Sequence, residues 1–442
     1  MVTRRWLSQT RGDPVGSRVL VFSSDCHAGL HIDGYKDYVE REYQEDLQRY
    51  LDHRPSREAA YRSRLDDEHL VTYEEQREER HGFSGAMDSQ RRLKELEADG
   101  VVGEVLFPDG TSGSDNEVPF TAAFGHGALS RDARSIELAL AGQRAYNRWL
   151  AEMVDPDRQV GLALISYHDV AAAVKEINWA RGAGLRGVLL DGVDPSCPEP
   201  MLPPLYTPYY EPIWAALAEA RLPAHFHAGS GYPRLNPGLD TVDISSLGSA
   251  IGLVEASFFS HRALWNVLWG GVLERHPALK VVFTEQGSSW AGRAIRYMDW
   301  QWSQGQFKEQ ELLALRPSEY WARQCFLGSS VMTRFEVEER AQIGVEQMMF
   351  GTDFPHTEGT WGRTIRYVNA VFGPNNVTEP EARAMLGDNA IRCYELDRQK
   401  LQAIADSVGP TVEELLGAAD PALKDDPFIE TWSRKPPFDG AF

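Results

Sequence analysis

Short runs of apolar residues recur along the chain, separated by polar segments of very different length. We predict that eight of these runs are buried strands, because they are rich in Val, Leu, Ile and Phe and are closely followed by Gly, Pro, Asp or Ser. The predicted strands are 18–23, 101–107, 160–165, 187–190, 224–227, 280–285, 324–328 and 347–353.

Between most of these strands lie segments whose apolar residues repeat at helical spacing, such as Leu138, Ala141, Ala145 and Trp149. The predicted helices are 89–98, 135–153, 171–180, 209–221 and 290–300, with a helical stretch over 244–275. Strands that alternate with helices form parallel sheets, and eight such units close into a ring. The pattern therefore predicts a (β/α)8 TIM barrel of the α/β class.

We expect a single domain, 1–442, with a barrel core over 18–397. A stretch rich in Glu, Arg, Asp and Tyr, 35–98, is predicted to form exposed helices inserted after the first strand. The C-terminal extension, 398–442, contains a predicted helix at 411–418. The apolar residues that follow this helix favour docking on a neighbouring subunit over a frayed end. They are Phe428, Ile429, Trp432 and Phe438.

Composition limits the partners. The formal net charge of −20 argues against nucleic acid or an anionic membrane surface. The cysteines lie far apart, which predicts no disulfide framework and fits a reducing compartment. We find no signal peptide and no apolar run long enough to cross a bilayer. We therefore expect a cytoplasmic protein that acts on a small molecule.

The ends of several predicted strands carry residues of metal-binding type. Asp25 and His27 stand two positions apart after the first strand, so their side chains share a face, while Cys26 points away. The other candidates at strand ends are Asp191, His227, Glu285 and Asp353. Ligands converge at the carboxyl-terminal mouth of a TIM barrel, so we expect this set to hold a divalent metal in an active site.

Other residues near these strand ends have less specific signals. His356, three residues after a strand-end aspartate, and Trp290, at the start of a predicted helix, are candidates for substrate contacts. His225 stands two residues before His227, and we expect it to be a core or supporting histidine. His261 lies in an apolar helical stretch, where a packed or capping histidine is the default.

Five motifs stand in order along the chain: Asp-Cys-His at 25–27, His-Ala-Gly at 227–229, Leu-Glu-Arg-His-Pro-Ala-Leu-Lys-Val-Val at 273–282, Phe-Gly-Thr-Asp-Phe-Pro-His at 350–356 and Leu-Gly-Asp-Asn-Ala-Ile-Arg at 386–392. Together they resemble the amidohydrolase-related branch of the amidohydrolase superfamily, which includes aminocarboxymuconate-semialdehyde decarboxylase and related hydratases and hydrolases. The resemblance implies a metal-dependent TIM barrel that pairs as a homodimer. It implies metal ligands at Asp25, His27, His227 and Asp353.

Two positions depart from the family pattern. The family usually opens with His-x-His, where this chain has Asp25, and it usually carries a catalytic histidine after the sixth strand, where this chain has Glu285. With Asp353 and Asp191, three or four negative charges would then gather. Two like charges about 4 Å apart repel by roughly 4 kcal/mol at an effective dielectric constant of about 20. We therefore expect two ions, with Asp191 or Glu285 as a bridging carboxylate, and iron or manganese favoured over zinc.

Two mechanisms remain open at this point. In the first, the metal activates water or the substrate for hydrolysis or decarboxylation of a small carbonyl or carboxylate compound, with Asp353 and Glu285 as catalytic groups. In the second, the site resembles a nonheme diiron monooxygenase that hydroxylates an organic substrate, with terpenoids as one candidate class. The frequency of hydrolases in the superfamily favours the first, and Glu285 in place of histidine favours the second. A structural metal without turnover is the third alternative.

Overall fold

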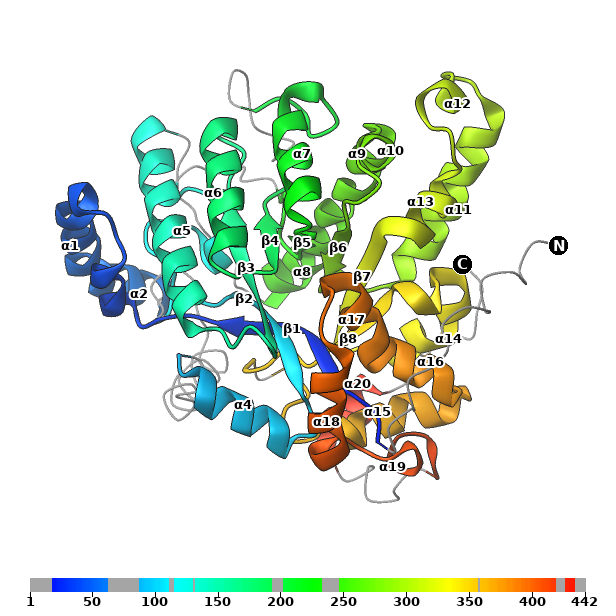
Figure 1. Cartoon of the computed structure of the whole chain (residues 1–442). Helices are drawn as coiled ribbons and strands as arrows, with labels where there is room; N and C mark the ends of the chain where they lie inside the picture. The colour runs from blue at the N-terminus through cyan, green and yellow to red at the C-terminus, as the bar shows by residue number, and fades with distance from the viewer. Residues whose placement is uncertain are drawn as a thin grey trace.

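Eight parallel strands form the centre of the molecule and are hydrogen-bonded in chain order (Figure 1). The computed structural model describes residues 18–62, 87–110, 115–129, 132–192, 202–232, 246–356, 358–418 and 426–433. The strands are β1 (Phe22–Ala28), β2 (Gly103–Pro108), β3 (Gln159–Ile165), β4 (Gly187–Leu190), β5 (Ala224–His227), β6 (Val281–Thr284), β7 (Cys325–Ser330) and β8 (Met348–Gly351). The predicted TIM barrel is confirmed.

The strands are covered on both faces. Every strand residue except Ser330 is buried. Helices cover the outside of the barrel and side chains fill its inside, so a strand such as β4, with the sequence Gly-Val-Leu-Leu, is apolar on both faces instead of alternating. The ring closes between β8 and β1 without a regular ladder, through an isolated parallel bridge between Cys26 and Phe354.

The first strand lies further along the chain than predicted. β1 begins at Phe22 and runs through Asp25 and His27. The apolar residues before it are buried outside the sheet, where the Val19 amide donates to Pro410 O in the C-terminal extension. The register of β1 against β2 shifts after Ser23, because three steps along β1 match two steps along β2. This β-bulge adds one residue to β1 just before the motif.

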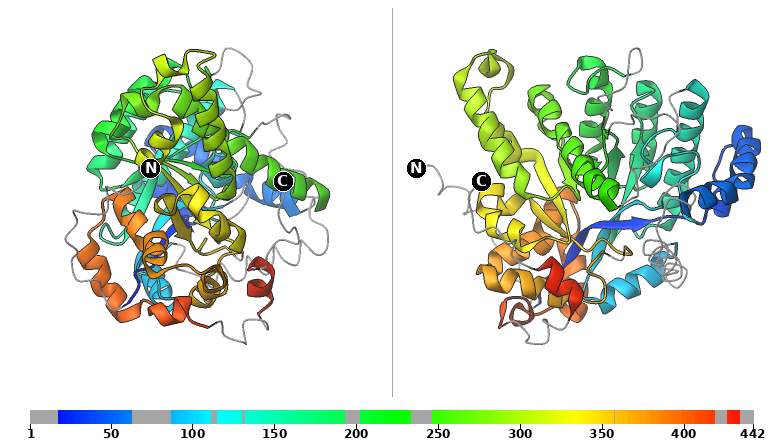
Figure 2. Two further views of the ribbon diagram at one scale, coloured as in Figure 1. Left: turned by 90° about the vertical axis from the view of Figure 1, so that its right-hand side faces the viewer. Right: turned by 180° about the vertical axis from the view of Figure 1, so that it is seen from behind.

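Helices surround the strands on the outside (Figures 1 and 2). Those that match predicted segments are α4 (Ser89–Ala98), α5 (Ala133–Met153), α6 (Val170–Gly182), α7 (Glu211–Ala220), α8 (Ser246–Ser260), α9 (Arg262–Trp269), α10 (Val272–Arg275), α11 (Ser289–Gln304) and α19 (Val412–Leu416). Two more, α1 (Gln44–Asp52) and α2 (Arg54–Arg62), lie in the insertion that was predicted to be helical. The others are α12 (Glu309–Leu312), α13 (Pro317–Gln324), α14 (Arg334–Ile343), α15 (Thr364–Phe372), α16 (Glu379–Arg383), α17 (Asn389–Tyr394), α18 (Arg398–Val408) and α20 (Pro427–Trp432). Within the described ranges, no helix combines the length and apolar character that a bilayer span requires.

The charged insertion is less exposed than predicted. Tyr35, Tyr43 and Leu47 are buried, and α4 buries Arg92 and Leu96. The prediction weighed the number of charged residues, whereas burial follows their spacing, which leaves one face of each helix for the barrel. Residues 63–86 of the insertion lie outside the described part of the chain.

The C-terminal extension docks on the protein's own barrel. The Phe428 ring in α20 lies 5.8 Å from the Tyr367 ring in α15, and the Arg363 guanidinium lies 4.7 Å from the Phe428 ring centroid. Ile429 is fully buried. Docking on a neighbouring subunit is therefore wrong for Phe428 and Ile429. The Trp432 side chain and all of Phe438 lie outside what the structure describes.

Candidate metal centre

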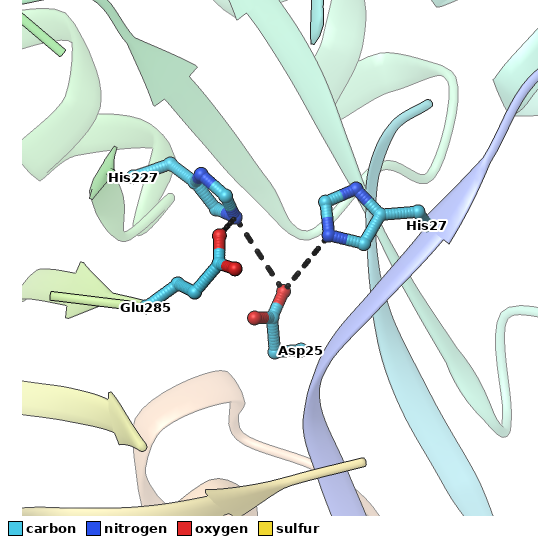
Figure 3. Close-up of side chains that lie close together, drawn as sticks. All are labelled: Asp25, His27, His227 and Glu285. Atoms are coloured by element: carbon cyan, nitrogen blue, oxygen red, sulfur yellow. Dashed lines mark ion pairs between the residues drawn. The ribbon is translucent and has the colours of Figure 1, made fainter. Parts of the chain in front are cut away.

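Four side chains from three strand ends meet at the mouth of the barrel (Figure 3). Asp25 and His27 belong to β1, His227 ends β5, and Glu285 directly follows β6. Asp25 Oδ1 lies 3.7 Å from Nε2 of both histidines, and Glu285 Oε2 lies 3.2 Å from His227 Nε2. One possible ligand atom of each residue lies within 4.8 Å of the others. Four of the residues singled out in the sequence are thus brought together.

The facing atoms of this cluster are suited to a cation. Asp25 Oδ1, His27 Nε2 and His227 Nε2 are buried and have no hydrogen-bond partner. The other ring nitrogens face carbonyls, because His27 Nδ1 lies 2.9 Å from Pro108 O and His227 Nδ1 lies 3.2 Å from Ala228 O. These carbonyls favour a proton on Nδ1, which leaves the Nε2 lone pair for the cluster. Each unpaired buried atom costs about 1–3 kcal/mol, and a bound cation would remove this cost.

Two members of the cluster have raised pKa values, so they bind protons more tightly than usual. Burial disfavours a charged His227, but the charges of Glu285 and Asp25 outweigh this and raise the pKa of His227 to about 9. Burial raises the pKa of Glu285 to about 8, with His227 opposing the rise and Asp353 and Asp25 adding to it. Protons and a divalent cation would therefore compete for the same place.

A second group of donors shares His27 with the first. Asp353 Oδ1 lies 3.3 Å from His27 Nε2 and 3.0 Å from His356 Nδ1. The His356 ring stacks on the His27 ring with centroids 4.0 Å apart, and its Nε2 lies 3.4 Å from Asp109 Oδ1. Burial disfavours charge on both His356 and Asp353. Their mutual attraction nevertheless raises the pKa of His356 well above its usual value and lowers the pKa of Asp353.

The backbone is unusual at two of these positions. Glu285 and Asp353 have φ angles of 55° and 58°, a left-handed conformation that costs a non-glycine residue roughly 1–3 kcal/mol. Each is held by its own amide: Glu285 N donates to Gly328 O at 3.0 Å and Asp353 N to Asp25 O at 2.9 Å. Gly351 allows the close approach of β1, because a Cβ at this position would lie 2.8 Å from Asp25 Cβ. Such strain concentrates at functional sites.

Asp191 joins neither donor group, although it directly follows β4 as predicted. Its Oδ1 lies 2.5 Å from Nδ1 of His126, which follows a short 3-10 turn, η4 (Ala123–Gly125). The ring centroids of His126 and His227 are 6.2 Å apart. Asp191 therefore contacts His126, which lies beside the cluster, and is not itself one of the four residues. We missed His126 because it follows no strand directly. Asp109 was also missed, although it follows β2 and carried the same signal as the others.

The remaining candidates are placed as follows. His225 is buried, with Nδ1 3.0 Å from Val188 O and Nε2 3.0 Å from Tyr394 Oη, which confirms a core role. Trp290 stacks on His261 with ring centroids 4.0 Å apart, which confirms a packed His261. Contact of Trp290 or His356 with a substrate stays a prediction.

Comparisons with known proteins bear on this site. The sequence model of the family described as amidohydrolase matches residues 95–396. The match begins after β1, so Asp25 and His27 lie outside it. A search of curated proteins found no match.

Solved structures share the fold over nearly their whole length. An amidohydrolase from Mycobacterium avium subsp. paratuberculosis K-10 is 19% identical, with a TM-score of 0.59 over 85% of this chain and 99% of that one. The 5-carboxyvanillate decarboxylase of Sphingomonas paucimobilis is 16% identical, with a TM-score of 0.55 over 86% of this chain and 100% of that one. A dihydroxybenzoic acid decarboxylase from Polaromonas sp. JS666, solved with manganese and the inhibitor 2-nitroresorcinol, is 16% identical, with a TM-score of 0.54 over 87% and 99%.

Proposed function

Because the chain belongs to the amidohydrolase family, we propose that it is a metal-dependent enzyme that decarboxylates a small organic acid at the mouth of its barrel. The observation that carries this proposal is the convergence of buried donor atoms without hydrogen-bond partners. The solved decarboxylases of the same fold support the choice of reaction. This choice remains a proposal, because their sequence identity to this chain is only 16%.

Asp25, His27, His227 and Glu285 would hold a divalent ion. Sets of carboxylate oxygens and imidazole nitrogens suit manganese or iron at least as well as zinc, and the Polaromonas decarboxylase contains manganese. When bound, such an ion polarises a substrate oxygen and stabilises negative charge that develops there.

The protein's own side chains would orient the substrate and move a proton. Asp353 Oδ1 is buried without a hydrogen-bond partner between His27 and His356. From this position Asp353 would pass a proton from His356 to the carbon that loses its carboxylate. The Glu285 side chain is 33% exposed, so it faces the mouth and would contact the substrate as well.

The expectation of two ions rests on charge, and two features weaken that basis. Asp191 is paired with His126 instead of joining the cluster, and a protonated His356 would offset the charge of Asp353. In addition, both groups of possible ligands include His27, whose Nδ1 faces Pro108 O, so only its Nε2 can bind a metal. One nitrogen binds one ion, and therefore the two groups cannot each hold an ion through His27. We propose one ion in the four-residue group. Two ions remain a prediction that metal analysis decides.

Hydrolysis is the second candidate reaction, because the unpaired Asp353 oxygen is equally placed to take a proton from an attacking water. The oxygenase hypothesis gains no support from the comparisons, since the neighbours described above are an amidohydrolase and decarboxylases.

The test uses full-length protein that is depleted of metal and reloaded anaerobically with Mn²⁺, Fe²⁺ or Zn²⁺. We expect one ion per chain and metal-dependent CO2 release from a panel of hydroxybenzoates and carboxyvanillates, both lost in His27→Ala. Metal-dependent hydrolysis of amides or lactones without CO2 release would favour the second candidate. Two irons per chain with consumption of oxygen would support the oxygenase, and turnover by metal-free protein would contradict metal dependence.

A further inference from the structure

The joint at which the barrel closes also carries most of the donor atoms. β7 and β8 pair over four residues, whereas β8 and β1 share only the bridge between Cys26 and Phe354. Two hydrogen bonds between backbone groups cross this joint: Asp353 N donates to Asp25 O at 2.9 Å and His27 N to Phe354 O at 2.7 Å. Side chains add further bonds, such as those from Thr352 N to Ser23 Oγ at 2.9 Å and from Ser24 Oγ to Met349 O at 3.0 Å. The positions of the Asp25, His27 and Asp353 side chains therefore depend on a joint with few backbone hydrogen bonds.

One buried side chain spans this joint from outside the barrel. Arg92, on α4, donates from Nη1 to His27 O at 2.7 Å and from Nη2 to Phe354 O at 3.2 Å. The first carbonyl belongs to His27, a proposed metal ligand in β1, and the second belongs to the residue directly after Asp353. The guanidinium also lies 4.6 Å from the Phe354 ring centroid. Because its planar fork has fixed geometry, it sets the distance between the two carbonyls.

Burial of the Arg92 guanidinium costs folding free energy, which indicates that its hydrogen bonds to the two strands serve a purpose beyond packing. Its side chain is 0% exposed, and burial of a guanidinium is unfavourable unless the charge is paired. Glu104 on β2 pairs with it at 2.7 Å and also accepts a hydrogen bond from Gln159. Leu96 on the same helix shows that an apolar side chain serves the packing there. A leucine at position 92 would lack the hydrogen bonds to both strands.

We propose that Arg92 is a positioning residue, which holds the ends of β1 and β8 in register and thereby keeps the metal ligand His27 in place, with Asp353 beside it. This inference rests on the proposed metal site. It differs from a purely stabilising role, which would lower the stability of the fold and leave the metal affinity of the folded protein unchanged.

The test compares the buried Arg92 with Arg158, whose side chain is 12% exposed, in the full-length protein. Arg158, at the start of β3, donates to Val102 O at 2.8 Å and pairs with Glu97 at 2.5 Å. It makes the same kinds of contact, and its partner Glu97 lies on α4 as Arg92 does, but its hydrogen bonds go to α4 and to Val102 before β2 instead of to β1 and β8. Arg92→Lys is measured first, because it keeps a cation beside Glu104. The paired changes Arg92→Met with Glu104→Gln and Arg158→Met with Glu97→Gln then remove each cation without leaving an unpaired carboxylate.

The readout is Mn²⁺ affinity of the folded, metal-depleted protein, with the thermal midpoint measured alongside. We expect Mn²⁺ to bind roughly 10–100-fold more weakly in both Arg92 variants, the usual cost of losing a residue that supports a metal ligand. Arg158 variants with a similar loss of thermal stability should keep their affinity. Unchanged affinity in Arg92→Lys, or an equal loss in the Arg158 pair, would overturn the positioning role alone. A wild-type protein that binds none of Mn²⁺, Fe²⁺ or Zn²⁺ would overturn the proposed function as well.

Discussion

The two sides of the site differ in how much of their side chains is exposed to solvent. On one side, the seam wall, Asp25, His27, Asp353 and His356 have side chains that are 0–6% exposed. On the other, the open wall, the side chains of His126, Asp191 and Glu285 are 10%, 24% and 33% exposed. Under the proposed function, the seam wall would hold an ion away from water, and a substrate would approach from the open wall.

The difference follows from the elements behind each wall. Seam-wall residues are part of β1 or follow β8, and backbone hydrogen bonds between these strands hold them. The Ser330 hydroxyl also donates to Asp25 Oδ2. The open-wall residues follow β6, β4 and η4. They lie in loops, where the backbone is not hydrogen-bonded to a neighbouring strand on each side as it is inside the sheet. Metal binding and substrate recognition should therefore respond to different substitutions.

The largest expected effect is on the seam wall. His27→Ala removes a ligand and should weaken Mn²⁺ binding by more than about 100-fold, beyond the usual cost of changing a supporting residue. Isothermal titration of metal-depleted protein measures this. His261→Phe is the control, because His261 packs on Trp290 outside both donor groups. Equal affinities in the wild type and His27→Ala would show that the seam wall holds no metal.

Glu285 is the donor that links the two walls, so its replacement should have a smaller effect. In Glu285→Gln we expect Mn²⁺ affinity to fall about tenfold, since water can take the place of a partly exposed ligand. The same titration gives the answer. Affinity equal to that of the wild type would assign Glu285 to the open wall alone.

On the open wall, Asp191→Asn should lower kcat/KM about tenfold, because the loss of a charge-assisted hydrogen bond to His126 costs roughly 1.5 kcal/mol. Mn²⁺ affinity should not change. Steady-state kinetics with a substrate from the carboxylate panel, run beside the metal titration, separate the two effects. A parallel loss of metal affinity would mean that the walls are not independent.

The smallest effect concerns the stability of the metal-free protein against pH. Folding raises the pKa of His227 from 6.5 to about 9 and that of Glu285 from 4.5 to about 8. A raised pKa stabilises the folded state below the unfolded pKa, and this contribution is lost as the pH passes through the folded pKa. The Tm of the metal-free protein should therefore fall by a few degrees between about pH 5 and pH 9. Calorimetry with and without Mn²⁺ checks this. A Tm that rises over this range in metal-free protein alone would contradict the assignment.

Residues at strand ends were easier to predict from sequence than residues in loops. Asp25, His27, His227, Glu285 and Asp353 follow or end apolar strands, and the barrel topology places all such positions at one mouth. His126 is brought in by a loop whose path no periodicity encodes. Arg92 stands among many charged residues, and only its neighbours on β1, β2 and β8 reveal that it is buried. Site residues at strand ends can thus be predicted from the local sequence. The positions of loop residues and of buried charged residues depend on contacts with segments far away in the chain.

The bulge in β1 decides where the length of this strand can vary. It leaves Ser23 and Cys26 on one face, with the Cys26 thiol 3.1 Å from Ser23 Oγ, so loss of Ser24 would restore regular pairing with β2 and keep His27 at the barrel mouth. After the bulge the side chains alternate, so deletion of Cys26 would leave Asp25 and His27 on opposite faces. Insertions in the loops after β2 or β4 carry no such penalty, because loops do not alternate. Homologues should therefore vary in loop length but keep the spacing from Asp25 to His27. An alignment that opens a gap there would pair the wrong residues with the metal ligands.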